Sequence, residues 1–198
     1  MDLSSVDRDL FIFINSFVGK SSSFDALAKP LVNEYFVPTV LSLIIFSMWF
    51  YWDKKDKDVK QKGVLISVLG VVVGSLLLVT IINMLFQRPR PFEDLDVNLL
   101  FYKPTDPSFP ANSAVVAFAL STAVFLVDKK AGVAALLLSA FYGFLRVYVG
   151  VHFPSDVIAG ALIGAGSTIF VSQFDKLLME VVKILRTLLE ALGLAEFS

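Results

Sequence analysis

Cysteine is absent from this 198-residue chain, and histidine occurs only once, at His152. Without cysteine, the chain can form no disulfide and has no thiolate to act as a nucleophile or metal ligand. No other cluster of metal-binding residues is evident in the sequence, so we expect no metal and no cofactor. Basic tracts are missing as well, and the formal net charge is −1. We therefore expect no nucleic-acid partner.

Apolar residues, in contrast, dominate the chain: they make up 56% of the sequence, and the mean hydropathy is +0.74. A membrane-spanning helix needs about 20 predominantly apolar residues, within a range of about 17 to 25. Five runs meet this requirement: residues 36–52, 64–86, 110–127, 131–149 and 157–174. Short charged loops separate them, which disfavours a soluble protein with buried helices. We therefore predict an all-α fold, a polytopic membrane bundle of five to six transmembrane helices with amphipathic terminal helices.

The pattern divides the chain into three parts. Residues 1–35 should form amphipathic or re-entrant helices, or a sixth span, because their apolar runs are short and separated by a polar stretch. Residues 36–175 should form the transmembrane core. Residues 176–198 should form an amphipathic helix, since leucine and valine fall on one side and charged residues on the other. Such a helix lies on the membrane surface or packs against a partner, including a second copy of the chain in an oligomer.

The distribution of basic residues predicts the orientation of the bundle. Lysines gather in the loop 53–62, at Lys129 and Lys130, and in the C-terminal helix. These segments lie two spans apart and so on the same face, which should be cytoplasmic. The opposite face carries few basic residues. We expect it to face away from the cytoplasm, and the membrane to be the plasma membrane.

Two polar segments on that outer face can present groups that bind anions. In residues 87–92, prolines stiffen the backbone around Arg88 and Arg90, so both arginines occupy a fixed place at the interface. Side chains that merely extend from a helix end towards the interface are the alternative interpretation. In residues 107–113, Asn112 or Ser113 can cap the next helix, whose free N–H groups would attract an anion. A simple helix cap is the alternative here.

A third segment on this face contains Arg146, His152 and Asp156 within 11 residues. The arginine can donate two N–H groups to a phosphate, the imidazole can attack phosphorus, and the carboxylate can fix the tautomer of the imidazole. Pro154 favours a helix start, which would place Asp156 in the first turn and His152 just before it. A structural histidine is the ordinary alternative. Together, the three segments predict a phosphate-binding pocket.

These segments resemble the type 2 phosphatidic acid phosphatase superfamily, whose three motifs are KxxxxxxRP, PSGH and SRxxxxxHxxxD. Arg146, His152 and Asp156 have the spacing of the third motif, and Arg90 followed by proline matches the end of the first. Residues 110–113, Pro-Ala-Asn-Ser, stand where the second motif is expected. The Arg-Pro-Arg-Pro-Phe sequence also resembles the branch that acts on polyprenyl diphosphates. The substrate would then be a phospholipid or an isoprenoid phosphate in the membrane.

The resemblance also implies a role for each matching residue. His152 would attack phosphorus and form a phosphohistidine, and Asp156 would hold the other imidazole nitrogen. Arg90 and Arg146 would neutralise the phosphoryl oxygens. The helix start at Asn112 and Ser113 would supply further donors to the phosphate. Water would then hydrolyse the phosphohistidine.

Several motif positions depart from the family pattern: Asn83 replaces lysine, Leu145 and Ala111 replace serines, Asn112 replaces glycine and Ser113 replaces histidine. In the family, the lost histidine protonates the leaving group, and losing a general acid costs about 10²- to 10⁴-fold in rate. A lipid alcohol leaves as a basic alkoxide that needs this proton, whereas a lipid phosphate can leave as the anion. The departures therefore favour a diphosphate substrate.

Two further interpretations stay open, because the sequence does not show that turnover survives these replacements. One is a lipid-phosphate-binding protein that has lost catalysis, and the other is a phosphotransferase that uses an acceptor other than water. The complete set of Arg146, His152 and Asp156 argues against binding alone, since an anion site does not need a carboxylate that fixes a tautomer. Asp94, Asp96 or Asp106 could replace the missing proton donor.

Overall fold

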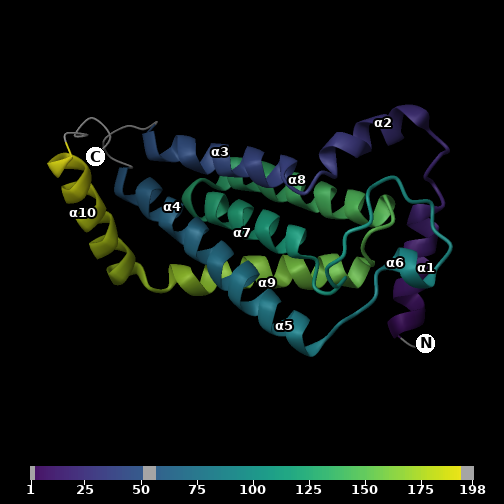
Figure 1. The fold of residues 1–198 in the computed structure, drawn as a ribbon. Helices are drawn as coiled ribbons and strands as arrows, with labels where there is room; N and C mark the ends of the chain where they lie inside the picture. The colour runs from purple at the N-terminus through teal and green to yellow at the C-terminus, as the bar shows by residue number, and fades with distance from the viewer. Residues whose placement is uncertain (1–2, 51–56, 193–198) are drawn as a thin grey trace.

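The computed structural model describes residues 3–50 and 57–192, and the regular elements in these ranges are helices (Figure 1). The predicted all-α membrane fold is confirmed. In chain order the helices are α1 (Leu3–Asn15), α2 (Ser22–Leu31), α3 (Phe36–Phe50), α4 (Lys57–Val71), the π-helical segment η1 (Val72–Val79), α5 (Thr80–Leu85), α6 (Pro91–Asp94), α7 (Asn112–Val127), α8 (Lys129–Tyr148), α9 (Pro154–Ser172) and α10 (Asp175–Ala191).

The chain is an integral membrane protein, and its predicted spans appear as helices. By length and composition, three described helices can each cross a membrane: Asp58–Leu85, Lys129–Tyr148 and Pro154–Ser172. Helices α2 and α3 qualify as a pair that is bent by 54° between them. Helix α7 is apolar but shorter, with 16 residues. The part of the predicted first span beyond Phe50 lies outside the described residues.

Helix α7 lies at the centre of the bundle because its small side chains let neighbouring helices approach closely (Figure 1). Its closest neighbour is α9, which contributes Gly160 and Gly164. A Cβ atom at Gly160 would lie 2.6 Å from the carbonyl oxygen of Ala111, and one at Gly164 would lie 2.2 Å from that of Val115. Small residues are what such close helix packing requires. As a result, the starts of α7 and α9 meet at one end of the bundle.

Figure 1 places α1, α2 and α6 at this end and α10 at the opposite end. Helix α10 is strongly amphipathic, as predicted, and buries Leu178 and Val182 against the bundle. Its Arg186 donates to Gln61 Oε1 at 2.6 Å and to Asp58 Oδ1 at 2.5 Å. These hydrogen bonds hold α10 against α4 of the same chain. Association of two copies through α10 stays a prediction, as does the boundary between the core and residues 176–198.

The described lysines of the predicted cytoplasmic face lie at this same end as α10. They include Lys62 near the start of α4 and Lys129 and Lys130 at the start of α8. Lys54 and Lys55 of the same predicted cluster lie outside the described residues. The motif residues occupy the other end of the bundle. The two sets are thus separated along the bundle axis.

Candidate active site

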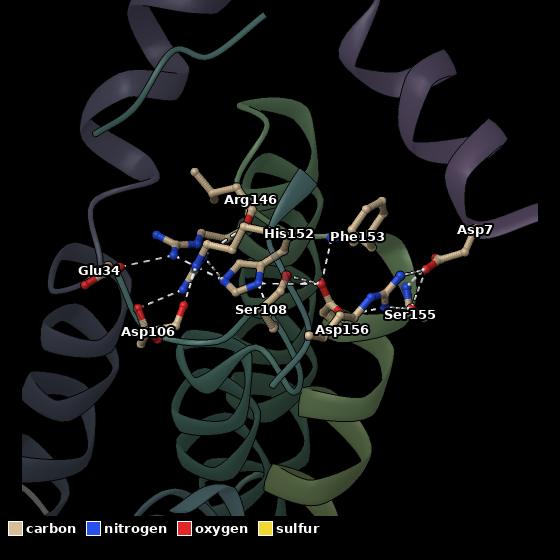
Figure 2. Close-up of polar contacts among 12 residues, drawn as sticks. Asp7, Glu34, Asp106, Ser108, Arg146, His152, Phe153, Ser155 and Asp156 are labelled. Atoms are coloured by element: carbon tan, nitrogen blue, oxygen red, sulfur yellow. Dashed lines mark hydrogen bonds and ion pairs between the residues drawn. The ribbon is translucent and has the colours of Figure 1, made fainter. Parts of the chain in front are cut away.

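Four side chains predicted from the sequence converge at the end of the bundle where α8 ends and α9 begins (Figure 2). Arg146 lies in the last turn of α8, His152 in the following loop and Asp156 in the first turn of α9. Arg90 comes from the loop after α5 and immediately precedes α6. All four are buried, with at most 2% of each residue exposed. The expected helix start at Pro154 is observed.

The two nitrogens of the His152 ring have different partners. Nδ1 lies 3.0 Å from the carbonyl oxygen of Ser108, which can only accept a hydrogen bond. Nδ1 is therefore assigned the hydrogen, and Nε2 carries the lone pair. Nε2 lies 3.2 Å from Nη1 of Arg90 and 3.3 Å from Nη2 of Arg146. The nucleophilic nitrogen thus faces two guanidinium groups.

Burial lowers the pKa of His152 to about 4. Asp156 opposes this shift, while the positive charges of Arg146 and Arg90 lower the pKa further. Burial also lowers the pKa of Arg90, against the opposing effect of Asp106. At neutral pH the imidazole is uncharged, as a nucleophile must be.

Each arginine is held in place by a carboxylate and by backbone carbonyl groups. Arg90 donates through Nη2 to Asp106 Oδ1 and through Nε to the Asp106 carbonyl oxygen, both at 2.9 Å. Arg146 donates through Nη2 to Glu34 Oε1 at 3.1 Å and through Nη1 to the carbonyl oxygen of Val32 at 3.2 Å. Of these two carboxylates, the sequence predicts a role only for Asp106, as a possible proton donor. No motif marks Glu34.

A cavity of about 320 Å³ opens in front of these groups. Its walls combine two guanidinium groups and an imidazole with two carboxylates and a few apolar side chains. The lining residues are Glu34, Tyr35, Pro38, Arg90, Asp106, Asn112, Ser113, Val116, Arg146 and His152. Because the positive groups converge on one side, the cavity can hold the oxygens of a phosphate.

Asn112 and Ser113 line this cavity, but the predicted capping role is wrong for both. The N-cap of α7 is Ala111, and no side chain of the described residues caps this helix. The helix begins there because the Ala111 N–H donates to the carbonyl oxygen of Asp156 at 3.0 Å, which holds Ala111 in an extended conformation. Asn112 Oδ1 instead accepts from Ser75 Oγ at 2.6 Å. Ser113 Oγ is buried and has no hydrogen-bond partner among the described residues.

The contact of Asp156 with the imidazole differs from what the resemblance implied. Its Oδ2 lies 3.8 Å from His152 Nδ1, which is too long for a hydrogen bond. This oxygen instead accepts from Ser108 Oγ at 2.6 Å and from the Phe153 N–H at 2.8 Å. Asp156 therefore reaches His152 through Ser108, a residue to which the sequence analysis gave no role.

Arg88 contacts Asp156 rather than the cavity. Its Nη1 donates to Asp156 Oδ1 at 2.6 Å, and its guanidinium lies 4.1 Å from the centre of the Phe153 ring. Arg90, two residues later, is the arginine that lines the cavity and contacts His152. This placement agrees with the motif register, in which Arg90 and its following proline match the family.

The model of the PAP2 superfamily matches residues 64–179 of the chain. The chain belongs to the PAP2 superfamily. The family predicted from the motifs is thereby confirmed, and the matched range includes Arg90, Arg146, His152 and Asp156.

Individual PAP2 relatives align over most of this chain. A protein of Bacillus licheniformis named bacitracin transport permease protein BcrC is 32% identical over 86% of this chain and 81% of its own length. The undecaprenyl-diphosphatase BcrC of Bacillus subtilis strain 168 is 25% identical over 94% of this chain and 93% of its own length. The crystal structure of Aquifex aeolicus LpxE superposes with a TM-score of 0.68 at 28% identity, covering 84% of this chain and 94% of that chain.

Proposed function

We propose that this protein is a membrane lipid phosphatase that cleaves a polyprenyl diphosphate through a phosphohistidine at His152. The broader class, a lipid phosphate hydrolase, is confirmed by relatives such as the undecaprenyl-diphosphatase of Bacillus subtilis. One observation supports the proposed attack by His152. The unprotonated Nε2 of His152 faces the cavity between Arg90 and Arg146.

In the first proposed step, the lone pair of Nε2 attacks the terminal phosphorus of the substrate. The bond from that phosphorus to the bridging oxygen breaks, and the lipid monophosphate leaves with the bonding electrons. Arg90 and Arg146 stabilise the negative charge on the remaining phosphoryl oxygens. The hydrogen on Nδ1 stays with its acceptor, the carbonyl oxygen of Ser108.

In the second proposed step, water attacks the phosphorus of the phosphohistidine. The nitrogen–phosphorus bond breaks, its electrons return to Nε2, and inorganic phosphate is released. The two arginines hold the phosphoryl group in the same place for both steps, so one cavity serves both reactions. Glu34 and Asp106 hold the arginines in place. Their negative charges also weaken the attraction between the arginines and the phosphate, which favours release of the product.

The position of Ser113 supports a diphosphate over a monophosphate. This residue lines the cavity where the family keeps a histidine, and serine cannot act as a general acid of comparable strength. A lipid phosphate can depart as an anion, whereas a lipid alkoxide requires a proton. The missing acid therefore costs little with a diphosphate and about 10²- to 10⁴-fold with a monophosphate.

An apolar groove beside the cavity supports a lipid substrate. The groove has a volume of about 510 Å³ and runs along α3. Tyr35 and Pro38 line both the cavity and the groove, so the two adjoin. The other residues of the groove are Thr39, Ser42, Leu43 and Phe46. A phosphate in the cavity would allow a hydrocarbon chain to continue along this groove towards the membrane interior.

We further propose that the active site lies on the extracytoplasmic face of the plasma membrane. The lysine-rich end of the bundle is opposite to the cavity and should be cytoplasmic. Because the chain has no cysteine, Lys103→Cys and Lys130→Cys each introduce a single label site. An impermeant maleimide applied to intact cells should label only the first. Labelling of both or only of the second would refute this orientation.

The test of the function is phosphate release by the purified protein from a polyprenyl diphosphate and from the monophosphate of the same chain length. We expect release from the diphosphate, slower release from the monophosphate, and none from the diphosphate with His152→Ala. Binding of the diphosphate without any release would favour the lipid-binding alternative. Release that survives in His152→Ala would refute the phosphohistidine mechanism.

A further inference from the structure

Helix α1 places one carboxylate next to the residues that hold Asp156. Asp7 Oδ2 accepts from Arg88 Nη2 at 2.8 Å and from Ser155 Oγ at 2.6 Å, and its Oδ1 accepts from the Ser155 N–H at 2.8 Å (Figure 2). The Asp7 side chain is 10% exposed. These three hydrogen bonds join helix α1 to residues that are distant in the sequence.

An unbroken series of contacts leads from Asp7 to the imidazole. Arg88 uses its second terminal nitrogen, Nη1, to donate to Asp156 Oδ1 at 2.6 Å. Asp156 is completely buried, and its other oxygen accepts from the Ser108 hydroxyl at 2.6 Å. The carbonyl oxygen of the same serine accepts from His152 Nδ1 at 3.0 Å. Every link is a hydrogen bond between side chains or to a backbone group.

Asp7 determines how Arg88 can act on Asp156. A guanidinium is planar, so fixing both terminal nitrogens fixes the direction of each N–H bond. The Arg88 side chain is 30% exposed. Without Asp7, its Nη2 would lose this acceptor, and only Nη1 would keep its hydrogen bonds, to Asp156 Oδ1 at 2.6 Å and to Ser155 Oγ at 2.7 Å. Asp7 also balances the positive charge of Arg88, which would otherwise be opposed by Asp156 alone.

We propose that Asp7 is a positioning residue of the active site: through Arg88, Asp156 and Ser108, it holds the His152 ring in the orientation that attack requires. This proposal rests on the proposed role of His152 as the nucleophile. Asp7 does not line the cavity, so it should affect the rate of the reaction more than the binding of substrate. It also lies outside residues 64–179, the range that the family model matches. Helix α1 would therefore be part of the catalytic unit.

The first test compares Asp7→Asn with Asp9→Asn in phosphate release from a polyprenyl diphosphate. Asp9 lies on the same helix and is exposed, so it loses the same charge without touching the site. Misplacing a reacting group by about 1 Å costs on the order of 10²-fold in rate. We expect Asp7→Asn to lower kcat by about 10- to 100-fold with KM changed by less than about twofold. Asp9→Asn should match the wild type.

The second test measures the NMR signals of the His152 imidazole. His152 is the only histidine, so protein purified without a histidine tag gives a single set of imidazole NMR signals. Asp7→Asn should shift these signals, and Asp9→Asn should leave them unchanged. This readout does not depend on turnover. If the wild type releases no phosphate but the signals shift in Asp7→Asn, the proposed function fails while the positioning contact stands.

Unmoved signals in Asp7→Asn would overturn the proposal, and so would a shift that leaves kcat unchanged. If Asp7→Asn does not fold, Ser155→Ala replaces it, because this variant removes the hydroxyl that donates to Asp7 and accepts from Arg88 Nη1 while Asp7 itself stays in place. Ser155→Ala should shift the signals in the same direction by a smaller amount, with a smaller loss of kcat. Wild-type signals in Ser155→Ala would also overturn the proposal.

Discussion

The carbonyl oxygen of Ser108 accepts a hydrogen bond from Nδ1 of His152 at 3.0 Å. A backbone group thus fixes the tautomer, a task that a carboxylate performs in many hydrolases. Asp156 stabilises this arrangement indirectly, because its Oδ2 accepts a hydrogen bond from the Ser108 hydroxyl. Substitutions at His152 and at Asp156 should therefore differ in severity.

The first prediction compares Asp156→Asn with His152→Ala in phosphate release. Where a carboxylate binds the histidine directly, the same change to asparagine costs about 10⁴-fold. Here the Ser108 carbonyl keeps the tautomer, so Asp156→Asn should cost about 10²-fold or less, while His152→Ala should abolish release. An Asp156→Asn variant as inactive as His152→Ala would show that the carboxylate acts on the ring directly.

The second prediction concerns the titration of His152, which its imidazole NMR signals report without interference from another histidine. Burial should lower the pKa to about 4, so the signals should not move between pH 8 and about pH 5. The kcat/KM of the enzyme should show no loss attributable to His152 near its unperturbed pKa of about 6.5. A midpoint near that unperturbed value would contradict the buried site.

The lowered pKa has a consequence for stability with a definite sign. Between the folded-state pKa of about 4 and the unfolded-state value of about 6.5, the unfolded chain binds the proton more readily. The contribution of His152 to the free energy of unfolding should therefore fall as the pH decreases through this window, and be constant above it. His152→Gln should reduce this part of the pH dependence.

The third prediction compares how strongly vanadate, which mimics pentacoordinate phosphorus, inhibits variants of Arg88, Arg90 and Arg146. Arg90→Lys and Arg146→Lys keep the charge but lose the paired N–H groups, so inhibition should weaken about tenfold or more. Arg88→Lys should weaken inhibition less than either of these variants, because Arg88 contacts Asp156 and not the cavity. Equal weakening by Arg88→Lys and Arg90→Lys would mean that the motif register is wrong.

The fourth prediction is a gain of function at Ser113. This residue lines the cavity and stands where the family keeps its histidine. Ser113→His should raise hydrolysis of a lipid monophosphate more than that of a diphosphate, because only an alkoxide leaving group gains much from a proton donor. A wild type that already cleaves both substrates equally fast would refute the leaving-group argument.

The fifth prediction tests the close approach of α7 and α9. A Cβ at Gly164 would lie 2.2 Å from the carbonyl oxygen of Val115, whereas one at Gly166 would have no atom within 4 Å in the part of the chain that the structure describes. Gly164→Ala should destabilise the protein by about 1–3 kcal/mol through overpacking. Gly166→Ala should be neutral or stabilise it by up to about 1 kcal/mol. Thermal unfolding in detergent measures both, and equal melting temperatures would argue against the packing.

Much of the fold could be predicted because the signals are local. The apolar runs that became α3, α8 and α9 are contiguous in the sequence, and hydropathy depends only on neighbouring residues. The proline at 154 likewise predicted where α9 begins. The start of α7 was less predictable, because a hydrogen bond from Ala111 to the distant Asp156 carbonyl decides it.

An all-helical membrane protein follows from the amino-acid sequence alone, and so does the proximity of Arg146, His152 and Asp156, since six- and four-residue separations across a helix start bring such groups near one another. The groups that hold these three side chains in place depend instead on how the helices pack. Glu34 reaches Arg146 across 112 residues, and Asp7 reaches Arg88 across 81. Such contacts depend on how the helices pack around α7, and packing is a property of the whole bundle that no local pattern encodes.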